Sequence, residues 1–233
     1  MTPTFKTSEE CELRLVAYTR ADEVEFSHTL EGDMDRFPAS AARVSFGNEA
    51  GLHSEEQDNK LMNYLADHQH MTPFEYQHAT FMIECPLFIR SQIHRHRTFS
   101  FNEISRRYTS DDLGFWVPTT WRKQAEKNKQ ASEGQLEEDE YERLTAAYKV
   151  IMESSMSWYK DYLGAGVARE QARAILPQSL LTRFYMGGNL RNWAHFLKLR
   201  LDNHAQPEVR IVAQKIEKIL FDLWPNSMRA LMK

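Results

Sequence analysis

The chain has 233 residues and a formal net charge of −4, and 42% of its residues are hydrophobic while 27% are charged. This is the composition of an ordinary globular protein that can build one sizeable core, and the length allows one or two domains. No run of about 18 apolar residues suggests a membrane span, and residues 1–12 lack the apolar core of a secretory signal. The mildly acidic balance argues against broad, sequence-independent binding of nucleic acid. Cys11 and Cys85 lie far apart in the sequence, which favours a reduced protein in the cytoplasm.

The first third of the chain is predicted to mix strands and helices. Its expected elements are a strand at 13–18, a loop at 31–38, a helix that starts within 39–46, a helix at 55–68 and a strand at 77–85. The helix prediction at 55–68 is based on apolar residues at helical spacing after Ser54 and an acidic first turn. The strand prediction at 77–85 is based on alternation of apolar and polar residues. Cys85 lies on the apolar side of that strand, so we expect a core cysteine rather than a nucleophile.

The stretch from Arg90 to Tyr108 concentrates polar side chains of several kinds. Pro86 is expected to end the preceding strand and to open a short helix that leads into this stretch. Arginine has a rigid fork of donors that recognises phosphate, carboxylate or an imide edge at two points. Several such forks on one segment predict an anionic ligand. The poor helix formers Ser100, Asn102 and Ser105 suit a loop that donates to this ligand.

Three other interpretations of this stretch stay open. A solvated helix face also holds Arg, Glu and Ser. Arginines alternating with Phe99, Phe101 and Tyr108 fit a module that binds single-stranded nucleic acid, because bases stack on rings and phosphates pair with cations. A metal site at His94 and His96 is less favoured, because neighbouring arginines repel a cation and no further ligand follows at a suitable spacing.

Beyond this stretch, residues 115–118 are expected to form a short extended piece. Residues 122–140 are an almost wholly polar insertion, in which lysines precede glutamates. This insertion is predicted to be a surface loop or a solvated helix, and a lid over the site is a further hypothesis for it.

The C-terminal half is predicted to be rich in helices. The expected elements are helices at 141–163, 167–176, 189–202 and 207–223, and a strand at 180–186 that enters a turn at Gly187-Gly188. Apolar residues at helical spacing support the helices, and glycines and prolines mark their ends. No GxGxxG loop follows a predicted strand, so any dinucleotide must be held without a Rossmann fold.

Arg95-His96-Arg97, followed after residues 98–104 by Ser105-Arg106-Arg107, resembles the signature of the flavin-dependent thymidylate synthases. Ser100, Asn102-Glu103 and Tyr108 match the longer form of that pattern. Further blocks resemble the family in the same order, and they are Ala41–Phe46, Thr72–Glu75, Leu176-Pro177, Thr182–Phe184, Leu199-Arg200 and His204–Gln206. The resemblance covers most of the chain, from about residue 41 to about residue 223.

This resemblance implies an α+β fold, with an antiparallel-type sheet flanked by helices, as a single domain over residues 1–233. It implies the reductive methylation of dUMP to dTMP, in which methylenetetrahydrofolate donates the carbon and NADPH reduces a bound FAD that supplies the hydride. It also implies a homotetramer whose FAD sites are shared between subunits. The expected partners are dUMP and folate, without nucleic acid or membrane. The residues suit this chemistry, because a cofactor that carries the hydride leaves the protein to bind, orient and polarise.

The resemblance also implies roles for single residues. The expected FAD-binding residues are His70, Thr72, Arg95, His96, Arg97, Glu103, Asn189, Arg191 and His195. The expected dUMP-binding residues are Gln92, Arg95, Glu103, Ser105, Arg107, Arg183 and Arg200, and no metal ligand is expected. Arg200 is the expected catalytic electrophile, because a cation facing the imide edge stabilises charge that develops in the transition state. Two structural alternatives stay open. The first is a helix end closed by His70, and the second is an Arg200 at a helix end that pairs with Asp202 or with the helix dipole.

Covalent catalysis by the protein is not expected. Neither cysteine lies in a signature block, whereas the flavin-free thymidylate synthases depend on a cysteine nucleophile. Ser105 has no evident adjacent base, which favours a nucleotide-binding hydroxyl over a nucleophile. The competing classes are the single-stranded nucleic-acid-binding module and a non-enzymatic structural oligomer.

Overall fold

The computed structural model describes residues 3–20, 34–45, 47, 53–127 and 131–233. Its centre is a four-stranded antiparallel sheet with the strand order β2-β3-β8-β4. These strands are β2 (Leu13–Tyr18), β3 (His78–Pro86), β8 (Leu181–Asn189) and β4 (Ser100–Glu103). β3 and β8 pair along their whole length, from His78 opposite Asn189 to Pro86 opposite Leu181. The strands predicted at 13–18 and 77–85 are confirmed.

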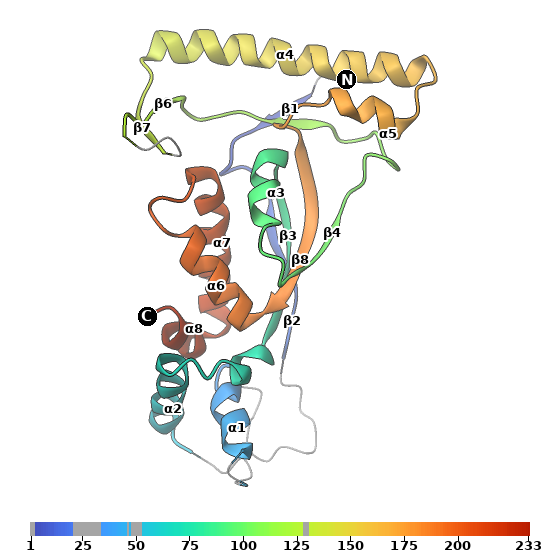
Figure 1. The fold of residues 1–233 in the computed structure, drawn as a ribbon. Helices are drawn as coiled ribbons and strands as arrows, with labels where there is room; N and C mark the ends of the chain where they lie inside the picture. The colour runs from blue at the N-terminus through green and yellow to red at the C-terminus, as the bar shows by residue number, and fades with distance from the viewer. Residues whose placement is uncertain (1–2, 21–33, 46, 48–52, 128–130) are drawn as a thin grey trace.

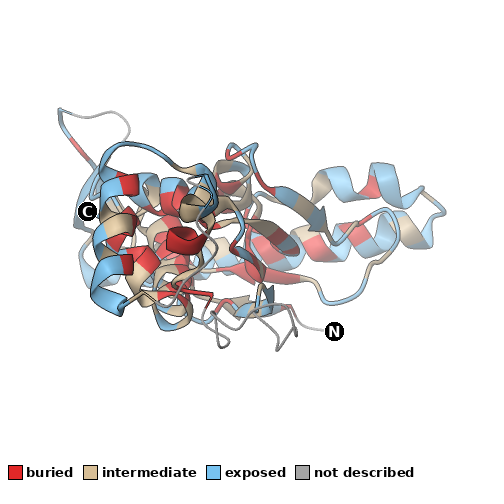
Figure 2. Cartoon of the chain, turned by 90° about the horizontal axis from the view of Figure 1, so that it is seen from below, coloured by how far each residue is buried: buried red, intermediate tan, exposed pale blue. Residues whose placement is uncertain are grey.

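Helices pack on one face of this sheet and build the main core (Figure 1). They are α3 (Leu87–Ile93), α6 (Leu190–Arg200) and α7 (Pro207–Leu223). Alternate strand residues face them, so that Phe81 of β3 and Phe184 of β8 are buried in one cluster with Trp193 of α6. Figure 2 shows the buried residues concentrated where these helices meet the sheet. The predicted α+β class with a helix-rich C-terminal half is confirmed.

The N-terminal helices lie at one end of the sheet (Figure 1). They are α1 (Phe37–Val44), α2 (Glu55–Asp67) and the 3-10 helix η1 (Thr72–Glu75), and they are joined there by α8 (Pro225–Leu231). α2 begins with a capping box in which Ser54 and Gln57 each accept a hydrogen bond from the other's backbone amide. α8 is absent from the sequence prediction, because Pro225 was expected only to close α7. Pro225 instead occupies the first turn of α8, where its missing amide hydrogen costs nothing.

A second, smaller core lies at the other end of the sheet, under the long helix α4 (Glu138–Gly164). Phe115, Met152, Met156 and Leu180 are buried together there. The same end holds β1 (Thr4–Lys6), which pairs in parallel with β5 (Gly114–Trp116) and so confirms the extended piece predicted at 115–118. The helix predicted at 167–176 is divided into α5 (Arg169–Ala172) and the 3-10 helix η2 (Arg173–Ile175). None of the described helices is long and apolar enough to cross a membrane.

The turn predicted at Gly187-Gly188 is wrong, because both glycines lie inside β8. Space explains why glycine occupies these positions. A Cβ atom on Gly188 would lie 2.5 Å from the ring of Phe99, and one on Gly187 would lie 2.8 Å from the hydroxyl of Thr80. A side chain at either position would therefore force the neighbouring Thr80 or Phe99 side chain to move.

Two segments predicted as loops contain strands. Within 122–140, β6 (Arg122–Gln124) and β7 (Ser132–Gln135) form a hairpin, and α4 begins at Glu138; residues 128–130 lie outside the described residues. Residues 100–103 of the signature form β4, which pairs with β8. Composition suggested loops because these strands are short and polar, and because long-range pairing decides their conformation. The loop predicted at 31–38 ends where α1 begins at Phe37, and its residues 31–33, like Phe46, lie outside the described ranges.

Candidate active site

The signature has two turns joined by one strand. α3 ends at Ile93, a turn occupies 94–99, β4 spans 100–103, and a second turn occupies 105–108. In the first turn Arg95 and Arg97 are exposed to solvent, whereas His96 between them is only 8% exposed. Adjacent residues of one motif therefore lie in two different environments.

His96 and Arg200 form an enclosed polar contact. Nε of Arg200 donates a hydrogen bond to Nε2 of His96 at 2.9 Å, and Nη2 of Arg200 donates to the backbone carbonyl of Gln92 at 3.2 Å. The His96 ring packs edge-on against Phe196, with the ring centroids 4.8 Å apart. Burial, and next the charge of Arg200, lower the pKa of His96 from 6.5 to about 4. The ring is therefore neutral at pH 7 and accepts the hydrogen bond.

Arg200 projects from the buried side of α6. It follows Phe196 and Leu197, which are fully buried. The alternative ion pair of Arg200 with Asp202 is wrong, because the Asp202 carboxylate lies 2.8 Å from the His204 ring and Arg200 bonds to His96 and Gln92. Burial also lowers the pKa of Arg200, although a guanidinium stays charged at neutral pH.

Glu103 and Gln92 lie on the same side of the sheet as Arg200. Oε1 of Glu103 accepts from the Thr182 hydroxyl at 2.7 Å and from Nε of Arg90 at 3.2 Å. Nε2 of Gln92 donates to Oε1 of Gln206 at 2.5 Å. Gln206 belongs to one of the blocks that resemble the family, but the sequence alone assigns it no role.

A groove of about 450 Å³ runs beside α6. Its polar lining includes Thr98, Arg191, Asn192, His195 and Lys198, and its apolar lining includes Met71, Ala194 and Leu231. Thr72 and His70 are exposed neighbours of Met71 in the chain, so the corner after α2 reaches this groove. The side-chain amide of Asn192 donates to the Thr98 carbonyl at 3.0 Å, which ties the arginine turn to α6.

The helix end before this corner is closed by His68 rather than by the His70 side chain. A ring nitrogen of His68 lies 2.9 Å from the Tyr64 carbonyl. Gln69 then takes a positive φ of 60°, and the backbone amide of His70 donates to the Leu65 carbonyl at 2.8 Å. The exposed His70 ring is thus not needed to end α2, which leaves it available to a ligand.

The charged groups around the groove differ in how they are paired. Among the described residues, no side chain or carbonyl pairs with the guanidinium of Arg95 or Arg97. Arg191 pairs with Glu75 of η1 at 2.5 Å, although its side chain is half exposed. Asn189 is the N-cap of α6, and its side-chain oxygen accepts from the Asn192 amide at 2.9 Å. The helix cap therefore uses the side-chain oxygen of Asn189, and the side-chain nitrogen remains for a ligand.

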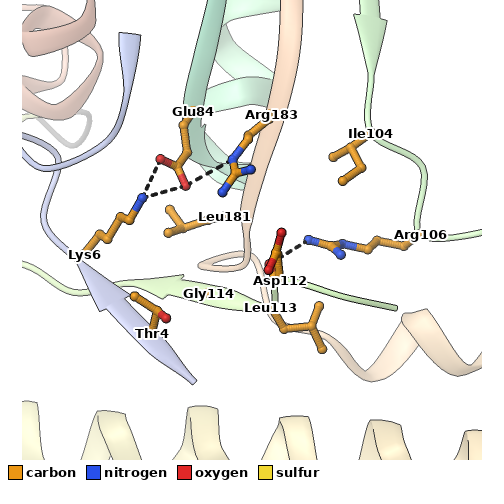
Figure 3. A pocket seen from close by; sticks show the side chains of 10 residues that line it. All are labelled: Thr4, Lys6, Glu84, Ile104, Arg106, Asp112, Leu113, Gly114, Leu181 and Arg183. Atoms are coloured by element: carbon orange, nitrogen blue, oxygen red, sulfur yellow. Dashed lines mark hydrogen bonds and ion pairs between the residues drawn. The ribbon is translucent and has the colours of Figure 1, made fainter. Parts of the chain in front are cut away.

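Arg183 lies on the opposite face of the sheet from these groups, because neighbouring Phe184 faces the helices. It borders a cavity of about 210 Å³ that also contains Lys6, Glu84 and Arg106 (Figure 3). The buried carboxylate of Glu84 lies 2.8 Å from Nζ of Lys6 and 3.6 Å from Nε of Arg183. Glu84 thus balances two cations, and no local sequence pattern signals this contact, since it depends on pairing between distant strands.

The turn that holds Ser105 and Arg107 begins beside Arg183, because the backbone amide of Ile104 donates to the Arg183 carbonyl at 2.9 Å. The hydroxyl of Ser105 accepts from the Arg107 amide at 3.3 Å. Arg107 is 52% exposed and lies 3.5 Å from the exposed carboxylate of Glu170, a pair of small energetic value. This second group of predicted residues is therefore separate from the group around Arg200.

Neither cysteine is available as a nucleophile. Cys11 and Cys85 are free and buried. Burial, followed by the Glu84 charge, raises the pKa of Cys11 to about 12. Burial raises the pKa of Cys85 well above its usual value. The thiolate that would attack a substrate is thus disfavoured at both positions.

The rings of the signature support the core. Phe99 packs against Trp193 with the ring centroids 4.5 Å apart, and Phe101 packs against His94 at 4.2 Å. Burial, and next Arg90, lower the pKa of His94, which fits this packed position. The described residues hold no group of three or more His, Cys, Asp or Glu side chains that could bind a metal ion. His94 and His96 therefore have structural partners of their own.

A cation-rich site without a reactive thiol suits an enzyme that acts on an anionic substrate with a cofactor, because the cofactor then carries the chemistry that the side chains lack. The family model described as "Thymidylate synthase complementing protein" matches residues 27–226. A flavin-dependent thymidylate synthase from Thermus thermophilus is 42% identical over 196 residues, which are 84% of this chain and 71% of that protein. Its namesake from Thermosipho africanus is 39% identical over 85% of this chain and 86% of that protein. The chain belongs to the flavin-dependent thymidylate synthase family.

A solved structure shares the fold. The UMP/dUMP methylase PolB from Streptomyces cacaoi, bound with 5-Br dUMP, has a TM-score of 0.83 and 28% sequence identity. The match covers 97% of this chain and 96% of that one. The shared fold thus extends over the sheet and the helices.

Proposed function

We propose that this protein is an FAD-dependent thymidylate synthase, which converts dUMP to dTMP with methylenetetrahydrofolate as carbon donor and NADPH as reductant. One observation supports the proposal above others: the signature holds Arg200 through His96, while it leaves Arg95 and Arg97 without a partner among the described residues in a turn whose Thr98 lines the groove beside α6. The motif of the family and the geometry of the site thus point to the same reaction.

The groove and the arginine turn fit FAD. Arg95, Arg97 and the exposed Lys198 offer positive charge to a pyrophosphate, while Met71 and Ala194 offer an apolar wall to a ring. We assign the FAD contacts to His70, Thr72, Arg95, His96, Arg97, Glu103, Asn189, Arg191 and His195. When bound, FAD supplies the hydride chemistry that no side chain of the protein can provide.

We assign the dUMP contacts to two groups of side chains. Ser105, Arg107 and Arg183 bind its phosphate, because the two arginines are about half exposed and the turn that holds Ser105 and Arg107 begins beside Arg183. The contacts to the rest of the nucleotide are assigned to Gln92, Arg95, Glu103 and Arg200. Bidentate arginine contacts give this site both affinity and orientation.

Arg200 polarises the pyrimidine ring. Activation of uracil builds negative charge along its imide edge, and a fixed cation there stabilises the transition state more than the ground state. Nε of Arg200 is engaged by the unprotonated Nε2 of His96, and one Nη2 hydrogen is engaged by Gln92. Nη1 and the second Nη2 hydrogen remain for a planar two-point contact with the substrate.

We also propose that the protein acts as a homotetramer with FAD sites shared between subunits. The sheet face opposite the helices carries Tyr185 and Ile104, whose exposed fractions are 44% and 36%, along a groove of about 490 Å³. Ile151 and Trp158 of α4 are 60% and 58% exposed on one helix face. Large exposed apolar side chains on two surfaces support burial against other copies of the chain.

Dilution tests this assembly. We expect flavin to dissociate as the oligomer does, because the residues assigned to FAD and dUMP lie in groups that one chain does not bring together. Analytical ultracentrifugation detected at 280 nm and at the flavin band would follow both events. FAD that stays bound to a fully dissociated monomer contradicts the shared site while leaving the reaction unaffected.

The alternative function, a single-stranded nucleic-acid-binding module, is not supported. Stacking of bases needs exposed rings. Phe99 is 8% exposed and Phe101 packs against His94 and Phe184, so only Tyr108 of the three aromatic residues is free. The family match points to an enzyme as well.

Two further expectations stay as proposals. Residues 1–233 are proposed to act as one domain, and the protein is proposed to work in the cytoplasm, where its two free thiols stay reduced.

A two-part assay tests the proposed function. We expect the purified protein to show a flavin absorption band at about 450 nm. We expect dTMP to form only when dUMP, methylenetetrahydrofolate and NADPH are all present. A colourless protein that shifts single-stranded oligonucleotides would instead support the rejected alternative.

A further inference from the structure

A chain of hydrogen bonds joins the β6–β7 hairpin to Gln92. Nη2 of Arg122 in β6 lies 2.8 Å from Oε1 and 3.0 Å from Oε2 of Glu208. Glu208 accepts from Nε2 of Gln206 at 2.9 Å. Oε1 of Gln206 in turn accepts from Nε2 of Gln92 at 2.5 Å. Four side chains from three separate parts of the sequence thus form one continuous path.

The Arg122–Glu208 pair at one end of the path fixes the direction of every hydrogen bond. A guanidinium can only donate and a carboxylate can only accept, so Gln206 must turn its amide nitrogen to Glu208. The side-chain oxygen of Gln206 then faces Gln92, so Gln92 must donate the hydrogen bond from its side-chain nitrogen. The side-chain oxygen of Gln92 is left without a partner among the described residues.

We propose that this path, from Arg122 through Glu208 and Gln206, orients Gln92 so that its amide oxygen accepts a hydrogen bond from the nucleotide. The proposal rests on the proposed function, because it takes dUMP as the ligand. Arg122, Glu208 and Gln206 are positioning residues in it, and Gln92 alone touches the ligand.

Burial makes this path rigid. The side chain of Glu208 is only 7% exposed, and that of Arg122 is 26% exposed. Separating such a pair would leave the buried carboxylate of Glu208 without a compensating charge. This costs free energy, so the pair stays together. Nε of Arg122 also donates to the Ser132 hydroxyl at 2.8 Å, so both strands of the hairpin support the guanidinium. The hairpin thus serves as an anchor for Gln92, a role different from the lid considered for this insertion.

Gln92 lies where an acceptor would contact the substrate. Its backbone carbonyl accepts from Arg200 at 3.2 Å, so the cation lies beside the residue that carries the amide oxygen. Arg200 can donate only, and it therefore meets oxygen atoms of the substrate. An N–H or O–H group beside those atoms needs an acceptor, and the oriented oxygen of Gln92 supplies one. If the side-chain amide of Gln92 could rotate freely, it would present its nitrogen to the ligand about as often as its oxygen. The site would then not distinguish a donor from an acceptor on the ligand.

Gln206→Met tests the path at its centre, since it keeps the bulk of the side chain and removes the polar group. We expect the dissociation constant of dUMP, measured by isothermal titration calorimetry on the flavin-loaded protein, to rise about tenfold, the scale of one lost hydrogen bond. Arg122→Met should raise it about threefold, because Glu208 remains as an acceptor. Arg143→Met is the matched control, since it breaks the exposed Arg143–Glu140 pair on α4 and should leave dUMP binding unchanged.

A double-mutant cycle separates orientation from general damage. If Gln206 acts through Gln92, then Gln206→Met costs no further dUMP affinity once Gln92 is Met. Additive losses, or unchanged affinity in a folded and flavin-loaded Gln206→Met protein, would overturn the proposal. Thermal melting of each variant shows whether it is folded.

Two analogues identify the donor on the nucleotide. dUMP methylated at N3 lacks the imide hydrogen, and 3′-deoxy-dUMP lacks the ribose hydroxyl. The analogue without the relevant donor should bind the unmodified protein and Gln206→Met equally well. If Gln206→Met weakens both analogues as much as it weakens dUMP, Gln92 accepts from neither group and the proposal fails. Failure of the proposed function would appear differently, as an unmodified protein that does not methylate dUMP.

Discussion

Arg200 at the end of α6 and the two arginines of the turn at 94–99 differ in how they are held. Arg200 lies on the helix side of the sheet and bonds to His96 and Gln92 before any ligand arrives. Arg95 and Arg97 lie one residue to either side of His96, and their guanidinium groups have no partner among the described residues. A fixed cation suits stabilisation of a transition state, because it costs no reorganisation during the reaction. Free cations suit a ligand that brings its own negative charge.

The largest expected effect comes from removing the fixed cation. Arg200→Ala should lower dTMP formation by at least about a hundredfold, the scale for one preorganised electrostatic partner. FAD binding and NADPH-dependent flavin reduction should persist, since we place Arg200 at the pyrimidine. Arg200→Lys should restore little, because a point charge cannot make a planar two-point contact. The two half-reactions are measured separately by stopped-flow absorbance and by product analysis. Slow flavin reduction with normal methylation after pre-reduction would move Arg200 to the FAD or NADPH site.

Removing a free cation should weaken FAD binding instead. Arg95→Ala and Arg97→Ala should each lower FAD affinity about tenfold, which corresponds to one charge-assisted hydrogen bond. The melting temperature of the flavin-free protein should not change, because neither guanidinium has a partner to lose. Fluorescence titration of the flavin-free protein gives the affinity, with Arg143→Ala as control. A drop in flavin-free stability would show that these arginines are structural.

Acid should act on the fixed cation through His96. The folded-state pKa of His96 is about 4, below the ordinary value of 6.5. Between these values the unfolded chain takes up a proton that the folded chain refuses, so the free energy of unfolding falls as the pH falls from 6.5 to 4. His96→Gln keeps an acceptor but cannot titrate, and its unfolding free energy should fall less over this window. Urea unfolding at several pH values measures the difference. The pKa of His94 is also lowered, but His94 is present in both the unmodified protein and His96→Gln. Its contribution therefore cancels when the two pH dependences are compared. Parallel curves for the two proteins would contradict the burial of a neutral His96.

The buried thiols should matter for stability alone. Cys11→Ala and Cys85→Ala, singly or together, should keep dTMP formation, and Cys85→Ala should cost about 1 kcal/mol or more in stability as a core residue. Thermal unfolding and turnover are measured on the same samples. A folded, flavin-loaded Cys85→Ala protein without turnover would point to a cysteine nucleophile.

The smallest effect is expected at Ser105. Its hydroxyl accepts from a backbone amide and has no Ser-His pairing among its described contacts, so Ser105→Ala should retain substantial activity with a modest rise in KM for dUMP. Steady-state kinetics at varied dUMP check this. A covalent adduct between Ser105 and substrate, detected by mass spectrometry, would contradict it.

The sequence by itself determined the elements whose signals are local. The capping box at Ser54 and the spacing of apolar residues specify α2, and the alternation around Phe81 specifies β3, because burial repeats with the period of each structure. The signature from Arg95 to Arg107 identified the family because its gapped spacing is long and specific.

Only the tertiary structure decided which neighbours those residues meet. The two glycines of β8 are explained by side chains from distant segments, Thr80 of β3 beside Gly187 and Phe99 beside Gly188. His96 turns inward between two outward arginines because Phe196 and Arg200 enclose it. The contact of Gln92 with Gln206, and of Glu208 with Arg122, joins parts of the chain that no local pattern relates. Local periodicity reports how much of a residue is buried, whereas the direction and partner of a polar side chain depend on the packing of the whole fold.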